Sequence, residues 1–207
     1  MALDELIPLA THEPVSPPVS TQGWWSLGRW SLGRPGLSRW GQQRRETALV
    51  RRRERELARL RAIDDARAVL QQAGELVRAG WMQGAWFQVR DQAGSARSIG
   101  PLELRLLEGR EVIGACLVGA VVEASGGHRQ AHSAPAGRAL DLLWDCLQDD
   151  RGWPTPPTFD RVCAPSVRAA RVRELTSWND AAGRTSTEVL RLIDSADNRA
   201  IREAAAL

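Results

Sequence analysis

The region from Gln42 to Ala79 carries the clearest helical pattern in the chain, and it limits the fold more than any other feature. Its first part, 42–61, is free of glycine and proline and rich in residues of high helix propensity. Further on, apolar residues recur at spacings of three, four and seven, which places them on one helical face: Leu57, Leu60, Ile63, Leu70, Ala73 and Val77. Gly80 follows and is a typical helix end. The pattern predicts one long helix over 42–79, buried mainly from Leu57 onward.

Other segments are also predicted to be helical. Val112–Ala124 is apolar on nearly every side and contains small residues that permit close packing, so we expect it to be the central and most buried helix. Ala139–Gln148 and Val167–Trp178 are amphipathic candidates. The last helix begins at a capping box, Thr185-Ser186-Thr187-Glu188, and we expect it to run over Thr187–Ala205.

Between Trp81 and Arg110 the helical pattern fades. Apolar and polar residues alternate around Ala85, Phe87 and Val89, and again around Leu102, Leu104 and Leu106. A turn-rich connection over 91–100 separates the two stretches, so the alternation predicts a small β-hairpin. The predicted fold class is therefore mainly α, with a compact helical domain over 62–207 that includes this hairpin.

Composition excludes some classes of protein. The longest apolar run, 112–122, is about half of the roughly 20 residues that a membrane-spanning helix needs. No apolar leader opens the sequence, and the cysteines Cys116, Cys146 and Cys163 have no metal-type spacing. These observations predict a cytoplasmic protein with no transmembrane segment. They also indicate no cofactor.

Residues 1–41 are predicted to form a disordered or flexible arm, because glycine and proline recur through them. Within the arm, the pentapeptide Trp-Ser-Leu-Gly-Arg occurs at 25–29 and again, unchanged, at 30–34. The arm therefore concentrates large apolar and cationic side chains. We expect it to dock to a partner protein through Trp24, Trp25, Leu27, Arg29, Trp30, Leu32, Arg34 and Trp40.

Charge separates the N-terminal segment from the rest of the chain. Residues 24–61 hold 11 Arg against 3 Glu, whereas residues 62–207 hold 17 Arg against 19 acidic residues. Tryptophan offers a stacking plane and arginine pairs with phosphates, so nucleic acid and an anionic membrane surface are alternative partners for 24–61. A leader of biased composition with no partner is the remaining interpretation. Residues 42–61 are the basic helical lead-in to the domain.

Three motifs stand out along the chain: Gly-Trp-Met-Gln-Gly at 80–84, Gly-Ala-Cys-Leu-Val-Gly-Ala-Val at 114–121, and Trp-Asn-Asp-Ala-Ala-Gly-Arg-Thr at 178–185 leading into Glu-Val-Leu at 188–190. Together they resemble domain-of-unknown-function family 6197, which is common in actinobacteria and their phages. The resemblance covers about residues 60–200 and implies a small, mainly helical fold. It supplies no mechanism. It does imply that Trp81 or Gln83 lies close to the 178–184 loop.

These paired motifs have two interpretations. Asn179 and Asp180 are suited to an Asx turn, with Asp180 paired to Arg184 and Trp178 packed beneath. Alternatively, a polar ligand pocket forms between the motifs, as in a small enzyme, and is lined by Trp81, Gln83, Trp178, Asn179, Asp180 and Arg184.

Other candidate sites have weaker support. His128 and His132 lie four apart, but they fall in a predicted loop, so solvent-facing histidines are favoured over a metal site. A Cys116/His132 nucleophile pair is disfavoured because Cys116 is predicted to be buried. No residue is assigned a catalytic role. The sequence favours a binding or adaptor protein, with a small enzyme and a nucleic-acid-associated protein as alternatives.

Overall fold

The computed structural model describes residues 35–91 and 94–207, with side chains from Trp40 onward. The chain divides into two units, Met1–Gln43 and Arg44–Leu207. The described residues of the first unit are the beginning of the long helix α1 (Pro35–Gly80). The predicted arm up to residue 34, with its tandem repeat, lies outside the described residues.

The long helix predicted from the sequence is confirmed, with two differences. It begins at Pro35 and not at Gln42, because proline is well suited to the first helical position, and Gly36 and Gly41 do not interrupt it. Its buried face begins at Ile63 and not at Leu57, whose side chain is 54% exposed. The apolar periodicity is thus continuous across two parts of α1 with different surroundings.

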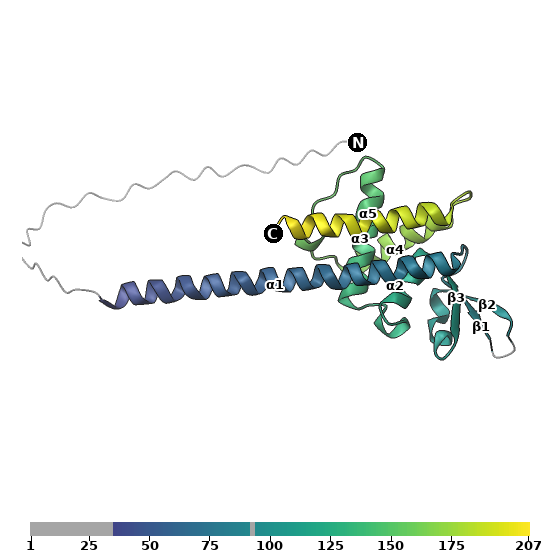
Figure 1. The fold of residues 1–207 in the computed structure, drawn as a ribbon, viewed down its shortest axis with the longest axis horizontal. Coiled ribbons are helices and arrows are strands. Elements are labelled where there is room, and N and C mark those ends of the chain that lie inside the picture. The colour runs from purple at the N-terminus through teal and green to yellow at the C-terminus, as the bar shows by residue number, and fades with distance from the viewer. Residues whose placement is uncertain (1–34, 92–93) are drawn as a thin grey trace, which may run out of the picture. The chain divides into compact units, whose positions relative to one another are not determined.

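The core of the second unit contains side chains from α1, from four shorter helices and from the small sheet described below. Figure 1 labels these elements. The shorter helices are α2 (Leu117–Ala124), α3 (Ala134–Asp150), α4 (Pro165–Asn179) and α5 (Ser186–Ala205). Helix α3 packs against both α4 and α5. An ion pair of 2.7 Å between Arg67 Nε and Asp197 Oδ1 links α1 to α5.

The predicted capping box at the start of α5 is confirmed. The Thr185 hydroxyl accepts a hydrogen bond from Glu188 N at 3.3 Å, and the Glu188 carboxylate accepts one from Thr185 N at 2.8 Å. Because both bonds satisfy backbone donors that the first turn leaves unpaired, they fix the point at which α5 begins. The predicted final helix is therefore present.

The structure contains a small antiparallel sheet with strand order β2-β1-β3, formed by β1 (Phe87–Arg90), β2 (Ala96–Ile99) and β3 (Glu111–Ala115). The predicted hairpin is present, but its second strand is β2, which lies inside the predicted connection. The segment around Leu104 is instead part of the 3₁₀ helix η1 (Pro101–Leu107). Pro101 at its first position and the return hydrogen bond from Gly100 N to Glu103 favour this helical turn over a strand.

The prediction of a single helix over Val112–Ala124 is wrong. Its first residues belong to β3, in which Val112 pairs with Val89, and α2 begins only after Cys116. The β-branched Val112 and Ile113 suit the strand. The small residues do permit close contact, since a Cβ on Gly119 would lie 2.1 Å from Trp86 O. The chain therefore makes a strand, a sharp turn and a short buried helix where one helix was expected.

Candidate functional site

The two motifs at 80–84 and 178–185 meet at the side chain of Asn179, which is fully buried at the end of α4. Its Oδ1 accepts hydrogen bonds from Trp81 Nε1 at 2.9 Å and from Leu117 N at 3.1 Å. Its Nδ2 donates to Met82 O at 3.2 Å and to Asp180 Oδ1 at 2.8 Å. One amide thereby connects the residues after α1, the start of α2 and the end of α4.

Gln83 and Asp180 reinforce this junction. Gln83 Nε2 donates to the backbone carbonyls of Asn179 at 2.8 Å and Ala181 at 3.1 Å. Asp180 Oδ1 accepts from Gly84 N at 3.1 Å. The expectation that Trp81 or Gln83 lies close to the 178–184 loop is therefore confirmed for both side chains.

The predicted pairing of Asp180 with Arg184 is wrong. Arg184 forms an ion pair of 2.9 Å with Glu188, which the capping box holds one turn further along, and its Nε donates to Trp178 O at 3.1 Å. The guanidinium lies over the Trp178 ring, 4.0 Å from the ring centroid. Hydrogen bonds from Thr185, above all from its backbone N–H, lower the pKa of Glu188 and keep the carboxylate charged toward Arg184.

The ligand role of these residues stays a prediction, and the geometry argues for a structural role. A primary amide has two donors and an oxygen that accepts two bonds, and every one of these positions on Asn179 is occupied by protein. Trp178 and Arg184 also line an open cavity of about 470 Å³ together with Asp150, Arg151 and Glu188. The lining of this cavity does not include the other candidates.

A second polar network was not predicted from the sequence. Asp145 on α3 is fully buried. It accepts a hydrogen bond from Thr158 Oγ1 at 2.6 Å and forms an ion pair with Arg161. Its other oxygen, Oδ1, is buried with no partner among the described residues. Nearby, Asp141 is shared by Arg168 at 2.7 Å and Arg171 at 2.9 Å.

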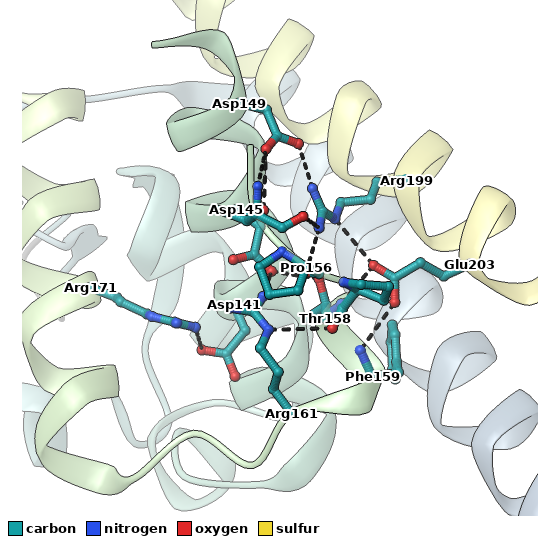
Figure 2. A network of polar contacts seen from close by, with 12 residues as sticks. Asp141, Asp145, Asp149, Pro156, Thr158, Phe159, Arg161, Arg171, Arg199 and Glu203 are labelled. Carbon is teal, nitrogen blue, oxygen red and sulfur yellow. Dashed lines mark hydrogen bonds and ion pairs between the residues drawn. The ribbon is translucent and has the colours of Figure 1, made fainter. Parts of the chain in front are cut away.

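Helix α5 completes this network from the other side (Figure 2). Glu203 accepts from the backbone N–H groups of Thr158 at 2.7 Å and Phe159 at 3.1 Å. Arg199 donates to Pro156 O at 2.9 Å and pairs with Asp149 and with Glu203. These bonds hold the proline-rich connection between α3 and α4 in place. A sequence pattern could have indicated this network. Asp141, Asp145 and Asp149 recur every four residues, as do Arg199 and Glu203, so each set lies on one helical face.

The cysteines are poor candidates for chemistry. Burial raises the pKa of the Cys116 thiol to about 11 and that of Cys146 to about 12. Cys116 Sγ instead accepts a hydrogen bond from Gly119 N at 3.4 Å and caps α2. Within 35–91 and 94–207, no group of three or more His, Cys, Asp or Glu side chains is arranged to hold a metal. In the same part of the chain, no helix is both long and apolar enough to cross a bilayer.

The N-terminal part of α1 in the second unit, Arg44–Arg61, forms a basic exposed segment. All of its residues are exposed except Glu56 and Arg59, which are half-buried. It holds 8 Arg against 3 Glu. An ion pair of 2.5 Å links Arg59 to Asp160 in the connection between α3 and α4. We refer to Arg44–Arg61 as the exposed half of α1.

The fold and these junctions define a small, mainly α-helical protein whose two motifs connect α1, α2 and α4. The model of the Family of unknown function (DUF6197) matches residues 61–199, and the chain belongs to this family. No curated protein and no solved structure matches the chain. The exposed half of α1 lies almost wholly before the matched region.

Proposed function

We propose that this chain is a binding or adaptor protein in which residues 62–207 form the scaffold and the segment 24–61 contacts a partner protein. The observation that carries the proposal is the exposed half of α1. There Leu49, Leu57 and Leu60 follow one another at spacings of eight and three, which place them on one helical face. Their side chains are exposed in the structure.

An exposed apolar face on a helix is costly to leave in water and suits a hydrophobic groove of another protein. The arginines flanking this face would then meet acidic groups at the rim of such a groove. The tandem Trp-Ser-Leu-Gly-Arg repeat supports the same interpretation, because it adds two further sets of tryptophan and leucine just before α1.

The experiment is a pull-down from host extract with the full-length chain and with the double variant Trp25→Ala/Trp30→Ala, in which every arginine is retained. We expect the wild-type chain to retain its partner as salt is raised, because groove docking rests on apolar contact. The double variant should lose that partner. Trp153→Ala is the control, since Trp153 is an exposed tryptophan outside the segment. Full retention by the double variant would contradict the proposal.

Nucleic acid is the second candidate, and the net charge of +5 on the exposed half of α1 (8 Arg minus 3 Glu) favours it. Binding of a short fluorescein-labelled DNA duplex would then weaken steeply with salt. Replacing Arg51, Arg53 and Arg61 with glutamine should reduce the slope of log K against log salt by about 3 if all of them contact phosphates. Arg173→Gln, an exposed arginine on α4, is the control. An unchanged slope would remove this candidate.

The alternative of a small enzyme has less support. An enzyme needs a cavity in which groups with shifted pKa values converge on a substrate. Where the paired motifs meet, the Asn179 amide has no free donor or acceptor for a ligand. The thiols whose pKa values are raised most, Cys116 and Cys146, are buried and protonated at neutral pH.

A further inference from the structure

A cavity of about 560 Å³ lies among α2, α3, α4 and η1, and its lining includes no residue of the paired motifs or of the exposed half of α1. Its wall is formed mainly by apolar side chains: Trp86, Leu104, Val118, Val122, Leu140 and Val172. The volume lies within the range of small-molecule sites, which are typically about 300–1,000 Å³ and mostly apolar with a few placed polar groups. The cavity therefore has the size and the lining of a ligand site.

Two polar side chains, Arg168 of α4 and His132, contribute to this apolar wall. Arg168 Nη2 donates a hydrogen bond to Asp141 Oδ2 at 2.7 Å. Arg168 Nε is buried and has no hydrogen-bond partner among the described residues. A buried N–H donor without a partner is costly, so this guanidinium has hydrogen-bonding capacity that the described residues do not use.

Gly137 on α3 gives this guanidinium its position. A Cβ at Gly137 would lie 3.0 Å from Arg168 Cζ and 3.2 Å from Arg168 Nε, closer than side chains normally approach. The absence of a side chain at 137 thus lets the guanidinium lie directly against α3, where it forms part of the cavity wall.

The local charge balance favours an anion. Asp141 is almost fully buried and is shared by two guanidinium groups, those of Arg168 and Arg171. The Arg171 Cζ lies 4.2 Å from the centroid of the Trp144 ring, and its Nε, like that of Arg168, is buried without a partner among the described residues. The two guanidinium groups carry one positive charge more than Asp141 offsets, and the guanidinium of Arg168 lies in the wall of the cavity.

We infer that this cavity binds a small apolar carboxylic acid. Its hydrocarbon body packs against Trp86, Val118 and Val122, and its carboxylate accepts a hydrogen bond from the Arg168 guanidinium. The carboxylate also neutralises the charge that Asp141 leaves uncompensated. This inference is independent of the partner proposed for the segment 24–61.

Isothermal titration with decanoate and with 1-decanol, its uncharged analogue, tests the inference on the full-length chain. The wild-type protein should bind decanoate more tightly than decanol. Arg168→Gln should weaken decanoate binding by about tenfold or more, because a charge-assisted hydrogen bond is lost, and should leave decanol binding unchanged. Arg173→Gln, which changes an exposed arginine on the same helix, should bind both ligands as the wild type does.

Folding of each variant is checked by circular dichroism. Should Arg168→Gln not fold, Arg168→Lys tests the same contact, because it keeps a cation beside Asp141 but lacks the planar guanidinium that would pair with a carboxylate. Val122→Trp, which fills the cavity, should abolish binding of both ligands. The inference is overturned if the wild-type chain shows no saturable decanoate binding. It is equally overturned if a folded Arg168 variant binds decanoate as tightly as the wild type.

Discussion

Within the second unit, α1 is one continuous helix, but its two halves have opposite surroundings: one half packs in the core and the other is exposed to solvent. In 63–79, the residues Ile63, Leu70 and Ala73 are completely buried in the core. In the exposed half, Leu49 and Leu57 are 61% and 54% exposed. Helical periodicity alone therefore does not separate residues that hold a fold together from residues that remain available for a partner.

The ion pairs follow the same division only in part, since Arg59 of the exposed half also pairs outside the helix, with Asp160. Arg67, in the buried half, is paired with Asp197 of α5 and has its pKa raised, mainly by that hydrogen bond. In the exposed half, Arg52 pairs only within the helix, with Glu56 one turn away. Exposed pairs of this kind contribute little to stability. The family match begins at residue 61, so it covers the buried half and excludes nearly all of the exposed one.

The largest predicted effect compares a leucine from each half. Leu70→Ala should lower the free energy of unfolding by about 2–5 kcal/mol, because it leaves a cavity in a close-packed core. Leu57→Ala should change it by no more than about 0.5 kcal/mol, since Leu57 is exposed. Urea denaturation of both variants measures the difference. Equal losses would show that the exposed half is covered in the isolated protein.

A second prediction concerns Asp180, which lies where the two motifs 80–84 and 178–185 meet, just after the buried half of α1. Asp180→Ala should lower the free energy of unfolding by about 1 kcal/mol, because one N–H of the buried Asn179 amide loses its acceptor, whereas the exposed Gly84 N–H can bond to water. Thermal and urea unfolding provide the measurement. Stability close to that of the wild type would contradict the structural interpretation and restore the ligand interpretation of the paired motifs.

The sequence predicted the elements whose causes are local. The periodicity of α1 and the capping box at Thr185 depend on residues within a few positions of one another, and both are confirmed. The family resemblance correctly brought Trp81 and Gln83 to the 178–184 loop. That contact joins residues almost a hundred positions apart, and no local pattern predicts it.

The failures have long-range causes. Val112 and Ile113 were assigned to a helix because they open the continuous apolar run 112–122, but pairing of β3 with β1 decides their conformation. The partner of Arg184 was misassigned because two acids lie within four residues of it, and the capping box fixes the position of only one of them, Glu188. The Asp141–Arg168 pair needed α3 and α4 to be packed together before it could be recognised.

A third prediction uses the thiols of the folded region, since the exposed half of α1 contains none. Burial raises the pKa of Cys116 from 9.0 to about 11. A raised pKa means that the folded state retains the proton more tightly than the unfolded state. The stabilising contribution is complete below pH 9.0 and is lost as the pH rises toward about 11.

Stability measured by urea denaturation should therefore fall over this range of pH, and less steeply in Cys116→Ala. The quantity compared is the slope of the free energy of unfolding against pH, because the substitution also changes packing and so shifts stability at every pH. Cys163→Ala serves as the control, since Cys163 is only partly buried. If Cys116→Ala and the wild type had the same slope, the thiol would make no contribution to the loss of stability at high pH.

The smallest predicted effect lies at the boundary between the two halves, where Arg59 pairs with Asp160. The Asp160 side chain is about half exposed, so solvent screens the pair and its expected contribution to stability is at most about 1 kcal/mol. Asp160→Asn should therefore produce a small loss in urea denaturation, and the loss should shrink further as salt is added. A loss as large as that of Leu70→Ala would mean that α1 is held to the domain through this ion pair more than through its buried apolar face. The division of the helix at Ile63 would then be the wrong one, and the boundary of the scaffold would move back to Arg59.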